Sequence, residues 1–216
     1  MQEADLKGLT INSKCSLLSG VIKTSIKSGL LEGKTNPFDQ VDYAASSTEH
    51  IYTAVEADYV AAKQVLKTLR MKQQLAIQLC TYCSYRYKEI KNSTRDSYDL
   101  DRCLMTITDA KNRACERVIP IPPANCEQLK EFDFQWGSNA ATNNQLKKVN
   151  PELTSHSLRH GLTRLDRELG TDSATIEAML GHRLSTSAMA NVYGNGYSPD
   201  AMKRAAVNIW DYLDNL

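Results

Sequence analysis

The chain has 216 residues, enough for one hydrophobic core or for one domain with part of another. Its content of 42% hydrophobic and 24% charged residues is ordinary for a globular domain, and no apolar run approaches the roughly 18 residues that cross a bilayer. The polar start, MQEADLKGLT, does not resemble a signal peptide, which predicts a cytoplasmic protein without a membrane partner. The net charge of +1 does not indicate a nucleic-acid partner, so any such partner must be argued from local residues.

The six cysteines include a single C-x-x-C pair, Cys80 and Cys83. A zinc site normally needs a second pair or histidines at zinc-finger spacing, and the chain has neither. The surrounding QQLAIQLCTYCSYRYKEI has the pattern of a helix. We therefore expect the two thiols to lie in the core rather than to bind a metal or take part in redox chemistry. Free thiols are typical of a reducing compartment.

The first part of the chain predicts one helix and its exit. Apolar residues recur at helical spacing across 10–31, and the glycine and proline of EGKTNPF then break the pattern. Residues 41–51 are mostly small and polar, which is typical of a linker. The chain therefore divides into a segment 1–40, a linker 41–51 and a larger domain 52–216.

The larger domain opens with two predicted helices and a hairpin. Thr53, with Glu56 three residues later, forms a capping-box pattern, so we expect a helix to start at TAVE and to run through ADYVAAKQVLKTL. A second long helix is predicted over about 72–90. Two strand-like runs follow at 103–108 and 117–122, joined by the polar DAKNRACE, which indicates an antiparallel hairpin. The proline within the second run indicates a strand end or a sheet edge.

Three helices with recognisable ends are predicted after the hairpin. Thr154 precedes SHSLRHGLTRLDREL, and Gly170 follows it, where a helix end favours glycine. DSATIEAML is a short helix closed by Gly181, and Ser198 with Pro199 starts the last helix. That helix carries an apolar stripe suited to packing on this chain or on a partner: Met202, Ala205, Ala206, Ile209, Trp210 and Leu213. The predicted fold class is therefore α+β, mainly helical, with one small antiparallel β-sheet.

Five segments with polar side chains follow one another over about 110 residues: YCSYRYKEI, DAKNRACERVIPI, HSLRH, LGH and a C-terminal tyrosine. Each has an ordinary structural explanation by itself. Arg86 has the character of a solvated or salt-bridged helix residue, and His182 that of a cap or surface residue. Five such explanations would have to coincide in this order, so the joint pattern favours a functional site.

In these segments the sequence resembles the tyrosine recombinase (phage integrase) family. CSYRYKEI resembles the family's first box, an arginine followed three residues later by an acid. HSLRH matches the second box, and MLGH matches the motif ahead of the nucleophile. The lysine that the family carries in its hairpin falls on Lys111. The candidate catalytic residues that this resemblance gives are Arg86, Lys111, His156, Arg159, His182 and Tyr193, with Glu89 and His160 in support.

The resemblance implies a tyrosine-recombinase-like catalytic domain over 52–216, preceded in 1–40 by the last helix of a core-binding (SAM-like) domain. It implies a site-specific DNA recombinase, the integrase of a phage or other mobile element, acting on DNA in the bacterial cytoplasm. The expected partners are double-stranded DNA attachment sites, further copies in a homotetramer on DNA that exchange C-terminal helices, and accessory DNA-bending or directionality proteins. No cofactor and no metal ion is implied.

The residue types suit the transfer of a DNA strand on chemical grounds alone. Attack on a phosphodiester needs a nucleophile, positive charge for the transition state and a proton for the leaving 5′-oxygen. Arg86 and Arg159 can each present a fixed fork to the non-bridging oxygens. His156 and His182 can donate hydrogen bonds to the phosphate, and His156 can also accept the phenolic proton. Lys111 in the hairpin turn can protonate the leaving oxygen, so a metal ion is not required.

Three assignments have alternatives. Glu89, three residues from Arg86 on a helix, is expected to orient that arginine only. His160 is as well explained by a structural role as by support of the site. Lys111 has nearby competitors for the role of the hairpin cation: Lys88, Lys91 and Arg113.

Two tyrosines compete for the role of nucleophile in MLGHRLSTSAMANVYGNGYS. Tyr193 follows His182 by eleven residues, close to the family's usual spacing, whereas Tyr197 follows it by fifteen. The two glycines after Tyr193 let the backbone move, whereas Tyr197 adjoins the helix start at Ser198 and is expected to pack there. We therefore expect Tyr193 to attack the phosphate once a cationic site favours the ionised phenol, whose usual pKa is ~10.

Two other functions fit part of the pattern. A degenerate integrase would only bind DNA, but all of the key positions are filled. A type IB topoisomerase uses a similar residue set, but the small domain and the HSLRH…LGH pattern favour the recombinase.

Overall fold

The computed structural model describes residues 8–39, 52–108, 116–181 and 197–216. The chain divides into two compact units, Met1–His50 and Ile51–Leu216, which are described separately. Among the described residues, no helix has the length and apolar character needed to cross a membrane.

The first unit is built around one helix, α1 (Gly8–Lys27). This helix confirms the predicted one but ends earlier than residue 31, and the chain turns at Gly29, whose φ is 79°. The following segment folds back on the helix, where Asn36 Nδ2 donates to Ser19 Oγ over 2.8 Å. Large apolar side chains remain exposed along this unit: Leu17, Leu18, Val21, Leu30 and Leu31. The origin of this unit in a core-binding domain stays a prediction.

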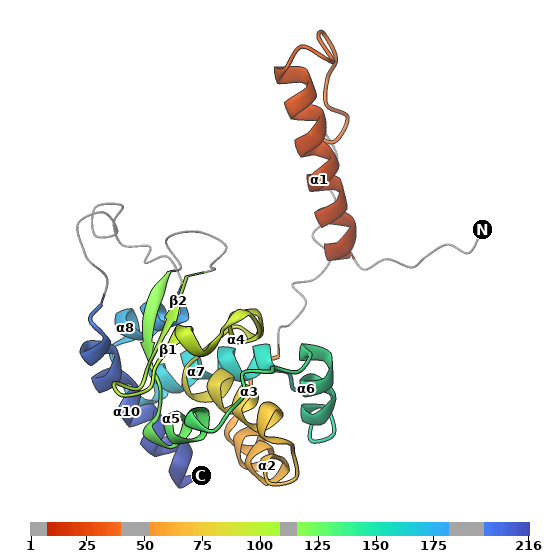
Figure 1. Cartoon of the computed structure of the whole chain (residues 1–216). Coiled ribbons are helices and arrows are strands. Elements are labelled where there is room, and N and C mark those ends of the chain that lie inside the picture. The colour runs from red at the N-terminus through yellow and green to blue at the C-terminus, as the bar shows by residue number, and fades with distance from the viewer. Residues whose placement is uncertain (1–7, 40–51, 109–115, 182–196) are drawn as a thin grey trace. The chain divides into compact units, whose positions relative to one another are not determined.

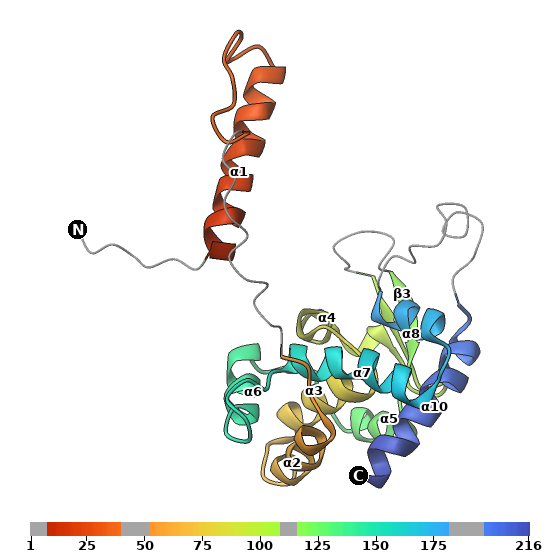
Figure 2. The same cartoon turned by 180° about the vertical axis from the view of Figure 1, so that it is seen from behind.

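The second unit is a mainly helical domain with one small sheet (Figures 1 and 2). Its described helices are α2 (Glu56–Leu66), α3 (Met71–Tyr82), α4 (Tyr87–Asn92), the 3₁₀ helix η1 (Arg95–Ser97), α5 (Pro123–Lys130), α6 (Asn139–Leu146), α7 (Ser155–Leu169), α8 (Ser173–Leu180) and α10 (Pro199–Asn215). Its strands are β1 (Tyr98–Asp99), β2 (Leu104–Ile107) and β3 (Arg117–Pro120). In both views α6 lies at one end of the domain, and α8, α10 and the sheet lie at the other. The predicted α+β class is confirmed.

The sheet is antiparallel, with the strand order β1-β2-β3. β2 pairs with β3 from Leu104 opposite Pro120 to Ile107 opposite Arg117, which confirms the predicted hairpin. Pro120 stands at the last pair of this ladder, where a missing N–H group costs little. Strand β1 was not predicted, because two residues are too few to form a periodic pattern.

Helices α3 and α7 pack against each other in the core of the domain. α7 buries Leu158, Leu162 and Leu165 on one face, at the spacing that brings helix residues into line. From α3 the buried side chains are Leu75, Ala76, Ile77, Leu79, Cys80 and Thr81. Complete burial of a large aliphatic side chain contributes about 1.5–3 kcal/mol, so this helix pair is a main support of the neighbouring elements.

The C-terminal helix α10 packs against its own domain. Its predicted stripe is buried at five positions: Met202, Ala206, Ile209, Trp210 and Leu213. It contacts β3, α8, α7 and α3. Trp210 Nε1 donates to the Tyr82 carbonyl oxygen over 2.8 Å, and the Tyr82 hydroxyl donates to Asp214 Oδ1 over 2.7 Å. Within the single chain, the stripe therefore closes the core of this domain.

Two predicted helix boundaries are wrong. α2 begins later than Thr53: its N-cap is Val55, whose main-chain N–H donates to Asp58 Oδ2 over 2.9 Å. Asp58 also accepts a hydrogen bond from Tyr52 over 2.6 Å, so a contact with the preceding segment helps to set this helix start. The helix predicted over 72–90 is in fact two helices, α3 and α4, separated by a turn at Ser84.

The C-x-x-C thiols lie in the core, as predicted. Cys80 and Cys83 are both fully buried, and burial raises the pKa of the Cys80 thiol to about 12. Within the described ranges, no group of three or more potential ligands is placed to hold a metal ion. Their complete burial shows that both cysteines pack as small side chains in the core.

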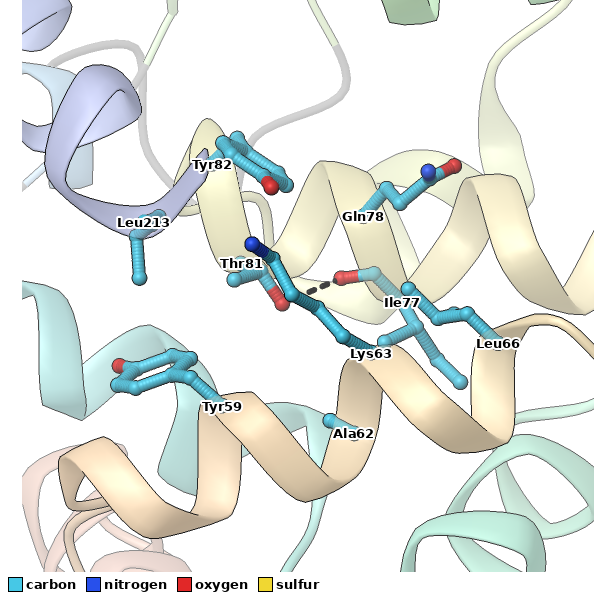
Figure 3. A pocket seen from close by; sticks show the side chains of 9 residues that line it. All are labelled: Tyr59, Ala62, Lys63, Leu66, Ile77, Gln78, Thr81, Tyr82 and Leu213. Atoms are coloured by element: carbon cyan, nitrogen blue, oxygen red, sulfur yellow. Dashed lines mark hydrogen bonds between the residues drawn. The ribbon is translucent and has the colours of Figure 1, made fainter. Parts of the chain in front are cut away.

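A pocket lies between α2, α3 and α10 (Figure 3). It is lined mainly by apolar and tyrosine side chains, among them Tyr59, Ile77, Tyr82 and Leu213. Thr81, also in its lining, donates from its hydroxyl to the Ile77 carbonyl oxygen over 2.8 Å. None of the candidate catalytic residues that the structure describes lines this pocket.

Candidate active site

The turn between α3 and α4 positions Arg86. Ser84 is buried and has a left-handed backbone conformation, with φ of 57°, which costs roughly 1–2 kcal/mol for a residue with a side chain. This turn makes Arg86 the N-cap of α4 rather than a residue inside one long helix. The Arg86 main-chain N–H donates to Glu89 Oε2 over 2.8 Å, and its Nη1 donates to Glu89 Oε1 over 2.9 Å. Glu89 therefore makes the contact that was expected of it.

Glu89 is shared with a second arginine, Arg117, which the sequence motifs do not indicate. Arg117 is the first residue of β3, and it donates from Nη1 to Glu89 Oε1 over 3.2 Å and from Nη2 to Oε2 over 3.1 Å. Both side chains are only 6% exposed. Arg117 Nε also donates to the Met179 carbonyl oxygen over 2.8 Å. Arg117 thus joins α4 to β3 and β3 to the end of α8.

Glu89 is held in its ionised form despite its burial. Burial by itself would raise the pKa of Glu89. The positive charge and hydrogen bonds of Arg117, together with the hydrogen bonds from Arg86, outweigh burial and lower the pKa below its usual value. One carboxylate therefore serves two arginines, and this group of three side chains keeps a positive charge.

Arg159, on α7, is held by main-chain carbonyl groups. It is 2% exposed. Its Nη1 donates to the Ser84 carbonyl oxygen and its Nη2 to the Leu180 carbonyl oxygen. The left-handed turn at Ser84 therefore supplies an acceptor to Arg159 as well as the start of α4. Because carbonyl groups carry no formal charge, these two contacts leave the charge of the guanidinium in place.

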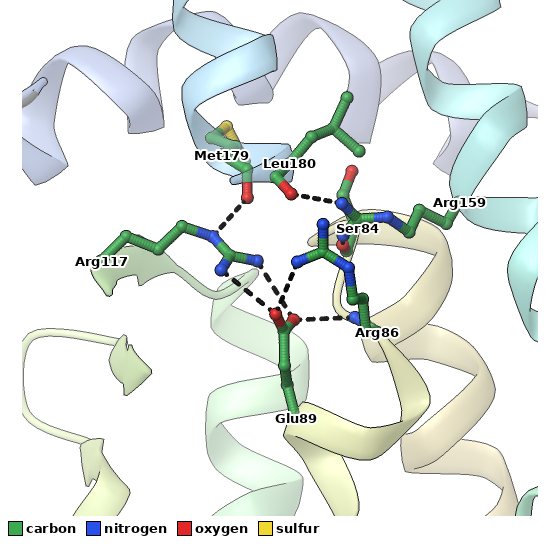
Figure 4. A network of polar contacts seen from close by, with 7 residues as sticks. All are labelled: Ser84, Arg86, Glu89, Arg117, Arg159, Met179 and Leu180. Atoms are coloured by element: carbon green, nitrogen blue, oxygen red, sulfur yellow. Dashed lines mark hydrogen bonds and ion pairs between the residues drawn. The ribbon is translucent and has the colours of Figure 1, made fainter. Parts of the chain in front are cut away.

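Three guanidinium groups converge at this point of the domain (Figure 4). Arg86 comes from the start of α4, Arg117 from β3 and Arg159 from α7, and Glu89 lies between Arg86 and Arg117. Burial, followed by the positive charge of Arg86, lowers the pKa of Arg159 to about 9, which leaves it charged at neutral pH. Three cations and one carboxylate form a cluster with an excess of positive charge, which attracts an anion.

His156 lies at the exposed start of α7, close enough to be affected by this charge. Partial burial, with the positive charges of Arg159 and Arg86, lowers the pKa of His156 below its usual 6.5, so the ring is mainly neutral at pH 7. Its Nε2 lies 2.9 Å from Nε2 of His160, one helical turn later. One of these nitrogens must donate and the other accept, which couples the tautomers of the two rings. His160 therefore contacts His156 directly.

The end of α8 brings the glycine of LGH to the cluster. Gly181 is the C-cap of α8 and has φ of 64°, the left-handed conformation that favours glycine. A Cβ atom at Gly181 would lie 2.7 Å from Arg117 Nη1, too close for two unbonded atoms. Both the backbone conformation and the packing of Arg117 therefore favour glycine at this position of the motif.

Five of the eight residues selected from the sequence are described, and they lie at or beside this cluster: Arg86, Glu89, His156, Arg159 and His160. The other three, Lys111, His182 and Tyr193, lie outside the described residues. The one signal for Arg117 was a cation at the first position of the otherwise apolar strand RVIPI, and that signal says nothing about its partners. Tyr197 is half-buried and packs against the core, as expected.

Comparisons with solved structures show the same fold in integrases. The chain matches the Tn1549 transposon integrase in complex with a circular intermediate DNA with a TM-score of 0.65 at 17% identity, over 97% of this chain and 82% of that chain. It matches a lambda integrase dimer bound to a COC′ core site with a TM-score of 0.64 at 16% identity, over 83% of this chain and 74% of that chain. The second unit therefore has the fold of a tyrosine recombinase catalytic domain.

The sequence comparison leads to the same family. No protein-family profile matches the chain. The chain is 26% identical over 146 residues to the tyrosine recombinase XerA of Thermococcus kodakarensis. This match covers 57% of the chain and 51% of XerA. The match thus extends over about half the length of this relative. The similarities in sequence and in fold together confirm the resemblance to the tyrosine recombinase family.

Proposed function

We propose that this chain is the catalytic part of a site-specific DNA recombinase, which cuts and rejoins DNA strands through a covalent 3′-phosphotyrosyl intermediate. The observation that carries the proposal is the convergence of Arg86, Arg117 and Arg159, of which the first two share the Glu89 carboxylate, next to a neutral histidine. Such a cluster supplies positive charge to the transition state of phosphoryl transfer without a metal ion. Two of the proteins with this fold are integrases in complex with DNA, which supports DNA as the substrate.

Arg86 and Arg159 hold the scissile phosphate from different depths. The Arg86 side chain is 38% exposed, and Glu89 holds one side of its fork, so the rest of the fork can meet a non-bridging oxygen at the surface. Arg159 lies inside the domain, where it is buried, and acts through its charge. Two of its N–H donors are taken by carbonyl groups, and its charge stabilises the negative charge that develops on the phosphate.

Tyr193 is the nucleophile in this proposal. Its phenolic oxygen attacks the phosphorus atom, the bond from phosphorus to the 5′-oxygen breaks, and a 3′-phosphotyrosyl ester forms. His156, neutral at pH 7, accepts the phenolic proton, and Lys111 gives a proton to the leaving 5′-oxygen. His182 donates a hydrogen bond to the phosphate. Attack of a second 5′-hydroxyl on the ester reverses the step and joins a new strand without ATP. The roles of Tyr193, Lys111 and His182 are supported by the motifs alone.

The partners proposed for this activity are double-stranded DNA attachment sites and further copies of the chain in a homotetramer on DNA. Accessory DNA-bending or directionality proteins belong to the same proposal. The source would be a phage or another mobile element; the Tn1549 integrase, which has the same fold, is named as that of a transposon. The first unit would then supply the last helix of a core-binding domain.

A suicide-substrate assay tests this function. The full chain is incubated with a pool of nicked duplexes whose sequence around the nick is randomised, so that the short strand carrying the new 5′-hydroxyl diffuses away and traps the intermediate. A protein–DNA adduct stable to denaturing electrophoresis is expected, and it should be absent with Tyr193→Phe. Tyr197→Phe is the matched control and should form the adduct.

Other outcomes would point to the alternative functions. A mobility shift without an adduct for any duplex in the pool would support a protein that only binds DNA. Adduct formation together with relaxation of supercoiled plasmid irrespective of sequence would support a type IB topoisomerase. The recombinase proposal requires the adduct together with a preferred DNA sequence among the captured duplexes.

A further inference from the structure

We propose that Arg117 is a positioning residue for this strand cleavage: it fixes Glu89, and through Glu89 the guanidinium of Arg86, relative to the end of α8. The inference rests on the proposed function and adds to it a residue that the family's motifs did not select. All three guanidinium nitrogens of Arg117 already donate within the domain, two to Glu89 and one to the Met179 carbonyl oxygen, so this guanidinium is committed to protein contacts. Its position and its contacts indicate that it acts through other residues.

The contacts of Arg117 account for this role. Its guanidinium donates two roughly parallel hydrogen bonds to the Glu89 carboxylate, at 3.2 and 3.1 Å, so that both oxygens of the carboxylate are held. The same two oxygens accept the main-chain and side-chain hydrogen bonds of Arg86, at 2.8 and 2.9 Å. Arg86 is thus held by an acceptor that Arg117 orients. If Arg117 is lost, Glu89 keeps only Arg86 as its partner among these contacts, and the two can tilt together.

A third donor ties Arg117 to the end of α8. Its Nε bonds the Met179 carbonyl oxygen over 2.8 Å, and Arg159 bonds the carbonyl oxygen of the next residue, Leu180. The two arginines therefore dock on successive carbonyl groups at one helix end. Arg117 connects to Arg86 through Glu89, and Arg159 connects to the turn before Arg86 through the Ser84 carbonyl group. Figure 4 shows these two connections side by side.

Arg117 also stands next to two segments that carry predicted site residues. It pairs with Ile107 at the end of the β2–β3 ladder that adjoins the connection containing Lys111. It also packs under Gly181, the residue that precedes His182. A single side chain of β3 therefore contacts both α4, which follows the first box, and the end of α8, which leads into the LGH motif.

The charges of Arg117 and Glu89 allow an experiment to distinguish the positioning of Arg86 from the mere neutralisation of the buried Glu89 carboxylate. Removing Arg117 alone leaves the buried Glu89 with less compensation, which destabilises the fold as well as the site. Removing Arg117 and Glu89 together eliminates the buried pair and is far better tolerated by the fold. Arg86 nevertheless loses its orienting partner in the double variant. A fall in the rate of strand cleavage in a stable double variant is therefore evidence for positioning.

The test compares four full-length proteins on one nicked duplex recovered from the randomised pool: the unchanged chain, Arg117→Met, Glu89→Gln and the double variant. We expect the rate of adduct formation at saturating DNA to fall about 100-fold in each variant, the size of effect that follows from a misplacement of about 1 Å. DNA affinity should change less than about threefold, because the surface cations remain. The double variant should form the adduct about as fast as either single variant, because the two residues act as a unit and their losses of rate should not multiply.

Two further variants and the thermal midpoint complete the test. Arg117→Lys keeps one charge but cannot hold both Glu89 oxygens and the Met179 carbonyl group, so we expect an intermediate rate. Arg95→Met removes an arginine that donates to the Tyr98 carbonyl oxygen, away from the cluster, and its rate should match the unchanged chain. A double variant that folds with an unchanged midpoint and cleaves at the full rate would overturn the inference alone. Absence of an adduct with the unchanged chain would overturn the proposed function and the inference together.

Discussion

At the scale of single residues, the arginine cluster depends on the backbone conformation of Ser84. Its left-handed backbone ends α3, starts α4 at Arg86 and turns a carbonyl group toward Arg159. Glycine adopts this conformation without the cost that a side chain imposes, and β-branched valine fits it worse than serine, so we expect the free energy of unfolding of Ser84→Gly to exceed that of Ser84→Val by about 1–2 kcal/mol. Urea unfolding of both variants measures the difference. Equal stability of the two variants would contradict the role given to this turn.

A second residue-scale prediction concerns His156. Its pKa is lowered by partial burial and by the charges of Arg159 and Arg86, so the ring should titrate below 6.5. A lowered pKa means that the folded state resists protonation, so His156 remains a proton acceptor at neutral pH, and stability falls as the pH drops below about 6.5. NMR titration should show this low midpoint, and Arg86→Gln should move it upward. A midpoint at or above 6.5 that does not respond to Arg86→Gln would refute the account.

The candidate site was partly predictable at this scale because its motifs are local. Arg86 and Glu89 are three residues apart, and His156, Arg159 and His160 fall within one segment, so each group could be found in a short window. Arg117 lies 28 residues from Glu89 in the sequence. Its contacts exist only once β3 has paired and α8 has packed, and no local pattern encodes them.

At the scale of elements, α7 depends on a glycine. A Cβ atom added at Gly161 would overlap the Tyr59 hydroxyl, and it would lie 3.1 Å from the Ala54 carbonyl oxygen. Tyr59 uses that hydroxyl to donate to the Leu158 carbonyl oxygen over 3.1 Å. We expect Gly161→Ala to lower the free energy of unfolding by about 1–3 kcal/mol through overpacking, although alanine favours helices.

Gly137→Ala is the matched control for this prediction. The nearest atoms to a Cβ at Gly137 are 3.9 and 4.0 Å away, an ordinary contact distance, so its stability should change by less than about 0.5 kcal/mol. Chemical denaturation of both variants compares them directly. If the two substitutions changed the free energy of unfolding equally, the close contact between Tyr59 of α2 and Gly161 of α7 would be contradicted.

The elements that were predicted well have local end signals. α7, α8 and α10 begin at capping residues and, for the first two, end at left-handed glycines, so their bounds follow from the sequence. The break between α3 and α4 was missed because serine gives no signal for a left-handed turn. The start of α2 was misplaced because the helix begins after Val55, whose main-chain N–H donates to Asp58. Asp58 is itself held by Asn150, far along the chain, over 3.0 Å.

At the scale of the whole molecule, the second unit contains the entire buried core of the described chain, from Ala54 to Leu213. We therefore expect removal of residues 1–51 to leave the cooperative unfolding of this unit unchanged within about 0.5 kcal/mol. Both tryptophans, Trp136 and Trp210, lie in the second unit, so their fluorescence follows its unfolding without a label. Loss of the cooperative transition in the shortened chain would show that the first unit contributes to the core.

The overall class was predictable from the sequence for a physical reason. A change from helical to alternating periodicity and back indicates a mainly helical domain with one hairpin. The packing of α10 on its own domain was not predictable. An apolar stripe has the same spacing whether it faces its own core or a partner.

The central claim, covalent attack on DNA by Tyr193, is tested most directly by identifying the amino acid that carries the DNA. The adduct from the suicide substrate is digested with trypsin and nuclease, and the nucleotide-linked peptide is sequenced by mass spectrometry. We predict a phosphodiester remnant on Tyr193, in the peptide that contains NVYGNGYS. A remnant on Tyr197 or on any other residue would contradict the assignment of the nucleophile.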